Sequence, residues 1–424
     1  MSSQISRRTV LAATAAATAG ATIPAAPAFA HRRPSTSVRF TLNAEVLDGG
    51  EQVTSLTLDT SRLGPIDPTS VTDDTFSVHV DATSPIAVTD NDPGYCVDRT
   101  VTGVRVDHRG SITLQLGYAE GEVGGGTLGY LDEQGRNVVL DLAYTVVENR
   151  PISLRHGRTV TIRKFEQGRL SDPEVDAFGY AVSRSGMNYR LFSPTKHGRS
   201  SAHSRGGRRP LIVWLHGGGE GGLPESNYYD NETLLRANRG ALGFATDEAQ
   251  RIFDGAYVVA PQCFSAWMDD GPRFAPLITE IIDEVAARHP IDPDRIHVVG
   301  CSNGGYMAMK MPVDYPRRFA TSVPICGVVQ AFTPGGDRLI TDDELEAIDT
   351  PTWLVASQDD PVVDPVANTE HAHDLIPGAV MSLYDHVIRN GYEFLGHWSW
   401  IYVARNDPSH HGTHIWQWMA RHRR

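Results

Sequence analysis

Cysteine is scarce in this sequence, and an excess of positive charge is absent. The chain has 424 residues but four cysteines, with no Cys-x-x-Cys pair, so neither a disulfide framework nor a cysteine-based zinc site is expected. After residue 30 no apolar run is long enough to cross a membrane. The formal net charge of −13 disfavours binding to nucleic acid or anionic lipid. What remains is a globular protein, whose length suggests two or three domains.

Residues 1–30 have the pattern of an export signal. Arg7 and Arg8 precede an alanine-rich apolar run that ends with small residues at Ala30, and this stretch contains no acidic residue. These features are typical of a twin-arginine signal peptide. We therefore expect cleavage after Ala30 and a secreted, extracytoplasmic mature chain. Export permits disulfides, and three of the four cysteines end predicted strands, so one pair could be bridged.

The next region, residues 37–150, contains short segments in which apolar and polar residues alternate, such as 75–80 and 112–116, with turn-forming residues between them. This pattern is typical of an all-β sandwich, here of the immunoglobulin-like kind. Cys96 has no cysteine partner within this region, so the disulfide of antibody domains is not expected. Residues 151–180 are interpreted as a connector.

Residues 181–424 predict an α/β domain with a mostly parallel sheet. Continuous apolar runs of the kind found in strands buried on both faces occupy residues 211–215, 256–260, 296–299 and 353–356. Helical stretches lie between them; in residues 274–289 the isoleucines share one face. Alternating strands and helices indicate the α/β class.

Ser302 lies in the pentapeptide GCSNG, residues 300–304, between the predicted strand 296–299 and a helical stretch over 306–311. The pentapeptide alone is a weak signal, but this context suits a nucleophilic serine. Such a serine sits on a sharp, strained strand-to-helix turn, where side chains two residues away on either side would clash. We predict that Ser302 is a nucleophile; the alternative is a plain glycine-rich turn.

A second glycine-rich segment, LHGGGEGG at residues 215–222, also follows a buried strand. Acyl transfer needs backbone N–H groups that face the developing oxyanion, and glycines supply them without blocking substrate. The predicted donors are the N–H of Asn303 and that of Gly218 or Gly219. A phosphate-binding loop is the alternative, but no Lys-Ser/Thr closes the run.

An acid and a base are expected later in the chain, in the order Ser, Asp, His. Asp360 follows the strand at 353–356 and precedes Pro-Val-Val, so we predict that it is the acid. Asp359 and Asp364 are alternatives, with loop capping as their other role.

His397 follows a glycine in the loop after the predicted strand 380–384, and we predict that it is the base. The other candidates are His386, His410, His411 and His414. No glutamate completes a zinc motif near the last three histidines. We therefore expect no metal and no organic cofactor.

The chain resembles bacterial exported esterases that join an immunoglobulin-like N-terminal domain to an α/β-hydrolase domain, near the prolyl-oligopeptidase and polyhydroxyalkanoate-depolymerase-like hydrolases. The matching segments are LHGGGEGG (215–222), APQC (260–263) followed by Trp267, GCSNGGYM (300–307), SQDDPVVD (357–364) and GHWSW (396–400). The resemblance implies Ser302, Asp360 and His397 as a catalytic triad. It implies an oxyanion hole near Gly218 and Asn303.

These motifs predict a serine carboxylesterase that acts through an acyl-enzyme on a small-molecule or polymeric ester. A prolyl-oligopeptidase-type peptidase is one alternative, although no blade-sized repeat of a propeller is visible. A hydrolase of polyester or acylated polysaccharide is another, in which the sandwich would bind polymer. A non-enzymatic binding protein with an inactive hydrolase fold is a third. The sequence leaves the acyl group, the alcohol and the oligomeric state open.

Overall fold

The computed structural model describes residues 37–88, 91–194, 207–331 and 337–424. The predicted export signal therefore lies outside the described residues. Thr36–Arg424 form one compact unit. Within the described part of the chain, no helix is both long and apolar enough to cross a bilayer.

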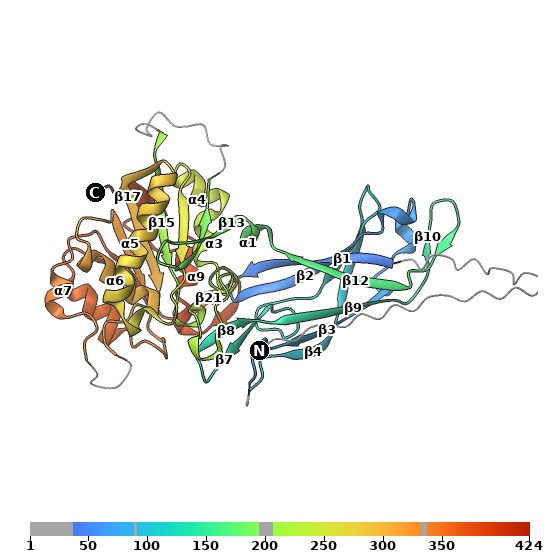
Figure 1. Ribbon diagram of the computed structural model, residues 1–424, viewed down its shortest axis with the longest axis horizontal. Helices are drawn as coiled ribbons and strands as arrows, with labels where there is room; N and C mark the ends of the chain where they lie inside the picture. Colours follow the sequence, from blue (N-terminus) through green and yellow to red (C-terminus); the bar gives the residue numbers. More distant parts are fainter. Residues whose placement is uncertain (1–36, 89–90, 195–206, 332–336) are drawn as a thin grey trace, which may run out of the picture. The chain divides into compact units, whose positions relative to one another are not determined.

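The N-terminal region consists of two β-sheets around an apolar core (Figure 1). Their strand orders are β12-β1-β2-β6-β5 and β4-β3-β9. The bounds are β1 Ser37–Leu47, β2 Gly50–Leu58, β3 Phe76–Thr83, β4 Tyr95–Arg99, β5 Val101–Val106, β6 Ile112–Leu116, β9 Asp141–Glu148 and β12 Lys164–Ser171. Because successive side chains of a strand point to opposite faces, every second residue of β3 is buried in this core. The predicted all-β character is confirmed.

Residues 151–180, interpreted as a connector, carry regular structure. Strand β12 pairs in parallel with β1, with Ser37 opposite Lys164, so this part of the segment completes the first sheet. The other elements of the segment are β10 Ile152–Ser153, β11 Thr159–Val160, α1 Pro173–Asp176 and the start of β13 Phe178–Val182. The predicted domain boundaries remain predictions.

The C-terminal region is built on one eight-stranded sheet with the order β13-β14-β16-β15-β17-β18-β19-β20. Strands β13, β14 and β16 are antiparallel neighbours, and all later pairs are parallel. The bounds are β14 Asn188–Phe192, β15 Arg209–Leu215, β16 Tyr257–Pro261, β17 Ile291–Cys301, β18 Thr321–Ile325, β19 Trp353–Ser357 and β20 Val380–Tyr384. The predicted parallel sheet is confirmed, with ends within a few residues of those expected.

Helices cover both faces of this sheet. From β15, Leu211 and Val213 join the core under α5 (Gly271–Arg288) and α6 (Asn303–Asp314). Ile212 and Trp214 point to the other face. That face is covered by α3 Gly240–Ala245, α4 Asp247–Ile252 and α10 Ile415–Arg421. The shorter elements include α2 Thr233–Arg236, α7 Asp342–Glu346, α8 His371–Leu375, α9 Trp400–Ala404, and the hairpins β7 Leu128–Leu131 with β8 Arg136–Val139, β21 Val387–Arg389 with β22 Tyr392–Phe394, and β23 Ser409–His410 with β24 Thr413–His414.

Parallel strands carry their carboxyl ends to one edge of a sheet, where α/β proteins place their ligand sites. The glycine run follows β15, Ser302 follows β17 and Asp360 follows β19. The topology thus brings three distant segments of the sequence to the same edge.

Candidate active site

Ser302 occupies the turn between β17 and α6. Its φ of 54° and ψ of −116° lie in a region that strains any residue with a side chain, and its N–H donates to the carbonyl of Ile325 at 2.8 Å. A Cβ at Gly300 would lie 2.2 Å from the carbonyl oxygen of Gly304, and one at Gly304 would lie 2.0 Å from that of Leu215. The predicted reason for glycines on both sides of Ser302 is confirmed.

Asp360 and His397 form a buried pair. Nδ1 of His397 lies 2.8 Å from Oδ2 of Asp360, and the two side chains are 9% and 1% exposed. Oδ1 of Asp360 accepts hydrogen bonds from the N–H groups of Val362 at 2.8 Å and Val363 at 2.9 Å. With both oxygens engaged, the carboxylate has one orientation, and Nε2 of His397 remains for proton transfer.

The alternative acids have other partners. Oδ2 of Asp359 lies 2.9 Å from Nδ1 of the exposed His386. Oδ1 of Asp364 accepts from the N–H groups of Val366 at 2.8 Å and Ala367 at 3.2 Å, the capping role considered for this residue. Among the three aspartates, the geometry therefore favours Asp360 as the partner of a buried histidine.

The histidines near the C-terminus lie apart from this pair. His410 and His414 belong to the short β23–β24 hairpin, and Nδ1 of His414 donates to the carbonyl of Asn406 at 2.8 Å. Within the described ranges, neither they nor His411 belong to a cluster of side chains with the spacing of metal ligands.

His216 fixes the start of the glycine run, residues 217–219, by hydrogen bonds. Its Nδ1–H donates to the carbonyl of Gly217 at 2.6 Å, and its Nε2 accepts from the N–H of Cys263 at 2.9 Å. Burial lowers the pKa of His216 to about 4, so the ring stays neutral in this tautomer at neutral pH. The run then passes close to the nucleophile: a Cβ at Gly218 would lie 4.0 Å from that of Asn303.

The predicted oxyanion donors start two helical segments. Asn303 is the first residue of α6, and its Oδ1 accepts from the N–H of Met268 at 3.1 Å. Gly218 and Gly219 open the 3-10 helix η4, Gly218–Glu220. N–H groups in a first turn lack an acceptor within their helix, and a helix N-terminus favours nearby negative charge. Both segments are therefore suited to stabilise an oxyanion.

One cavity of about 840 Å³ joins these groups; its lining includes Gly218, Gly219, Ser302, Asn303 and His397. Asp360 lies behind His397 and does not line it. Among the described residues, no hydrogen bond joins Oγ of Ser302 to the His397 ring. Such bonds are often long in ligand-free enzymes and shorten in the substrate complex.

Sequence reasoning missed the role of Cys326 as a neighbour of the predicted base. All four cysteines are free thiols, so the disulfide considered above does not form. Cys326 is buried, has a φ of 38°, and lies with Asp360 and His397 in a cluster whose ligand atoms are within 4.8 Å of one another. The available signal was its place at the end of a strand beside the nucleophile strand.

Glu220, within the glycine run, is a second such residue. It is 7% exposed, its Oε2 has no hydrogen-bond partner among the described residues, and burial raises its pKa to about 7. Its Oε1 accepts a long hydrogen bond of 3.5 Å from Nδ2 of Asn137 in the N-terminal region. An acidic residue within a glycine-rich turn was the signal in the sequence.

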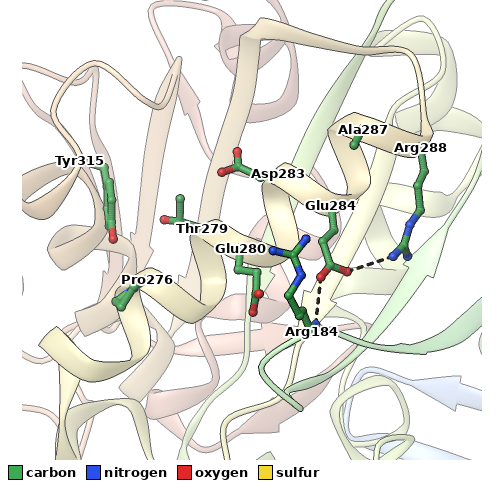
Figure 2. A pocket seen from close by; sticks show the side chains of 9 residues that line it. All are labelled: Arg184, Pro276, Thr279, Glu280, Asp283, Glu284, Ala287, Arg288 and Tyr315. Carbon is green, nitrogen blue, oxygen red and sulfur yellow. Dashed lines mark hydrogen bonds and ion pairs between the residues drawn. The ribbon is translucent and has the colours of Figure 1, made fainter.

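A second hollow, of about 520 Å³, lies along the outer side of α5 and contains none of the predicted residues. Figure 2 shows that Glu284 accepts there from the backbone N–H of Arg184 at 2.9 Å and from Arg288 at 3.3 Å. The described lining of this hollow contains no serine, cysteine or histidine. The predicted residues thus meet at the cavity beside Ser302 and not at this hollow.

Comparison with known proteins supports a serine hydrolase. The model of the prolyl oligopeptidase family matches residues 275–353. Poly(3-hydroxyalkanoate) depolymerase C of Paucimonas lemoignei is 35% identical over 182 residues, 37% of this chain and 39% of that protein. NocK of Nocardia uniformis subsp. tsuyamanensis, a protein with a proposed esterase activity, is 25% identical over 171 residues, 40% and 46% of the two chains. The chain spans less than half the length of these curated relatives.

A solved structure establishes the fold over nearly the whole chain. The crystal structure of a thermostable esterase superposes with a TM-score of 0.71 at 24% identity, over 91% of this chain and 99% of that one. With the strand order described above, this gives an α/β-hydrolase fold preceded by an all-β region.

Proposed function

We propose that this chain is a serine carboxylesterase with Ser302 as nucleophile, His397 as base and Asp360 as orienting acid. The observation that carries the proposal is the arrangement of these residues: a strained serine at a strand-to-helix turn lines the same cavity as a histidine whose other nitrogen bonds a buried carboxylate. A nucleophile, a base and an orienting group in this relation define the triad geometry on any fold.

The mechanism follows from these positions. Nε2 of His397 takes the proton of Ser302 as Oγ attacks the ester carbonyl, and Asp360 stabilises the imidazolium. The N–H groups of Asn303 and of Gly218 or Gly219 stabilise the oxyanion. The imidazolium then protonates the leaving alcohol, and water, activated by the same ring, releases the acid from the acyl-enzyme.

The decisive experiment removes the nucleophile. Ser302→Ala should lower kcat on 4-nitrophenyl acetate by about 10⁶-fold, toward the background of the oxyanion hole alone. Circular dichroism must show an intact fold, and a fluorophosphonate probe should label the wild type and not the variant. A folded Ser302→Ala protein with wild-type turnover would exclude Ser302 as nucleophile.

Adjacent aspartates offer a matched pair of variants for the acid. Asp360→Asn should lower kcat about 10³- to 10⁴-fold because the amide favours the wrong tautomer of His397. Asp359→Asn, which alters the contacts of this side chain with His386 and Ser357 and none with His397, should stay close to the wild-type rate. The reverse ranking would assign the acid to Asp359.

A polymeric ester is a second candidate substrate, favoured by the likeness to poly(3-hydroxyalkanoate) depolymerase C. A peptide substrate is a third, favoured by the prolyl oligopeptidase family match. Parallel assays on a soluble nitrophenyl ester, a polyhydroxyalkanoate film and a peptide nitroanilide separate the three. We expect the soluble ester to be cleaved fastest.

The same proposal covers the remainder of the chain. We infer that residues 1–30 are a twin-arginine signal and that residues 37–150 are an immunoglobulin-like sandwich. Replacing Arg7 and Arg8 by lysine should then retain the protein in the cytoplasm, as cell fractionation would show; unchanged export would exclude this signal.

A further inference from the structure

The cavity at Ser302 has walls from both regions of the chain. Besides the hydrolase loops, its lining includes residues 48–52, which are the β1–β2 turn and the start of β2, and parts of the β7–β8 hairpin. A substrate that fills this cavity would therefore contact the N-terminal region as well.

The β7–β8 hairpin lies against the glycine run. A Cβ at Gly219 would lie 2.9 Å from Nδ2 of Asn137 and 3.7 Å from Cε2 of Tyr130. The hairpin is fixed there, since the N–H of Val139 donates to the hydroxyl of Tyr228 at 2.7 Å. Arg136 adds a bond from Nε to the carbonyl of Gly222 at 3.3 Å. The hairpin is thus held by hydrogen bonds in a fixed position beside the predicted oxyanion hole.

Large apolar side chains gather at this cavity without being buried. Tyr130 is 51% exposed, Val362 is 46% exposed and Leu395 is 47% exposed, and all three line the cavity together with Trp398 and Trp400. Exposed apolar groups that converge on one hollow mark a binding surface. Tyr130 belongs to the hairpin, whereas Val362 follows β19 close to Asp360 and the other three lie within residues 395–400, around His397.

The charges of the lining provide no net attraction for an anionic substrate. Among the described residues that form it, four are acidic and Arg136 is the only lysine or arginine. Arg136 already donates to the carbonyl oxygens of Gly222 and Gly135. Asp48 and Glu51 have arginine partners outside the lining, Arg405 at 2.8 Å and Arg236 at 3.5 Å. Glu220 and Asp269 then face Arg136 alone, so a substrate carboxylate would meet no excess of positive charge.

We propose that the β7–β8 hairpin, through Tyr130 and Asn137, selects the acyl group of the ester, and that this group is uncharged and aromatic or similarly apolar. The proposal rests on the esterase function proposed above. It gives the N-terminal region a direct part in substrate choice.

The experiment compares esters that share one leaving group, 4-nitrophenyl acetate and 4-nitrophenyl 3-phenylpropionate, on the full-length enzyme. Tyr130→Ala and Asn137→Ala should lower kcat/KM for the phenylpropionate, mostly through KM, by about tenfold more than they lower kcat/KM for the acetate. Tyr130→Phe, which keeps the ring, should retain the preference. Tyr118→Ala is the matched control, because Tyr118 is an exposed tyrosine of the same region that does not line the cavity.

A nitrophenyl hemiester with a terminal carboxylate tests whether the selected group must be uncharged. Against the neutral ester of equal length, its kcat/KM should be at least about tenfold lower; equal values would overturn this part of the proposal. Hairpin variants that reduce both acyl esters equally, or neither, would overturn the selection by Tyr130 and Asn137 while the esterase function stands. A wild-type enzyme that cleaves neither ester would overturn that function as well.

Discussion

At the scale of single residues, the base has an unusual neighbour in Cys326. Burial by itself lowers the pKa of His397, but the adjacent Cys326 sulphur and the hydrogen-bonded Asp360 carboxylate raise it, and the net direction is upward. A raised pKa keeps the imidazole protonated up to a higher pH, and a protonated imidazole cannot accept the proton of Ser302. Activity should therefore increase as pH rises through the pKa of His397.

Removing the thiol tests this explanation. In Cys326→Ala the pKa of His397 should fall, because one of the groups that raises it is gone, and the acid limb of kcat/KM against pH should move to lower pH. Cys263→Ala removes another buried thiol outside the cluster and should leave the limb in place. An identical pH profile for Cys326→Ala and wild type would contradict the role of Cys326.

At the scale of elements, the unit formed by β17, Ser302 and α6 depends on backbone contact. Gly304→Ala places a methyl group 2.0 Å from the carbonyl of Leu215, and a strand backbone cannot move aside as a side chain can. We expect the free energy of unfolding, measured in urea, to fall by about 3 kcal/mol. In Gly218→Ala the new methyl would meet Asn303 at 4.0 Å, so stability should change by about 0.5 kcal/mol at most. Equal stability of the two variants would contradict this account.

Local signals made the catalytic half of the fold predictable. The strand at 211–215 is an unbroken apolar run because both faces of β15 are buried, and the glycines around Ser302 reflect a turn only a few residues long. The sequence also favoured Asp360 over Asp359 as the acid, on its place before Pro-Val-Val. The sequence could not predict that the N–H groups of Val362 and Val363 bond one oxygen of Asp360 while the other oxygen bonds His397.

Contacts between distant segments were not predictable in the same way. Strand β12 has no continuous apolar run, and its place is set by parallel pairing with β1, more than 120 residues earlier in the chain. Tyr130 and Asn137 lie in a short hairpin that has no catalytic pattern of its own. They reach the predicted site because they pack against Gly219, and such a contact cannot be predicted from the spacing of residues in the sequence.

At the scale of the whole molecule, we expect folding stability to decrease at acid pH because buried histidines are neutral in the folded protein. His297 is fully buried in β17, with Nδ1 bonded to Oγ1 of Thr321 at 2.8 Å, and burial lowers its pKa to about 3. In the unfolded chain the same ring has a pKa near 6.5. As pH falls below 6.5, His297 binds a proton in the unfolded state but not in the folded state, so the free energy of unfolding decreases.

The effect can be isolated from the other titrating groups by comparing variants. His297→Asn cannot take up this proton in either state, so the difference in free energy of unfolding between wild type and variant should shrink by about 2 kcal/mol between pH 8 and pH 5. His108→Asn, at an exposed histidine, should keep a constant difference from wild type over that range. Urea unfolding at the two pH values measures both. If the difference in free energy of unfolding between wild type and His297→Asn stayed constant, His297 would be protonated in the folded protein as it is in the unfolded chain. Acid sensitivity would then have another origin, and His216 would be the next buried neutral histidine to replace.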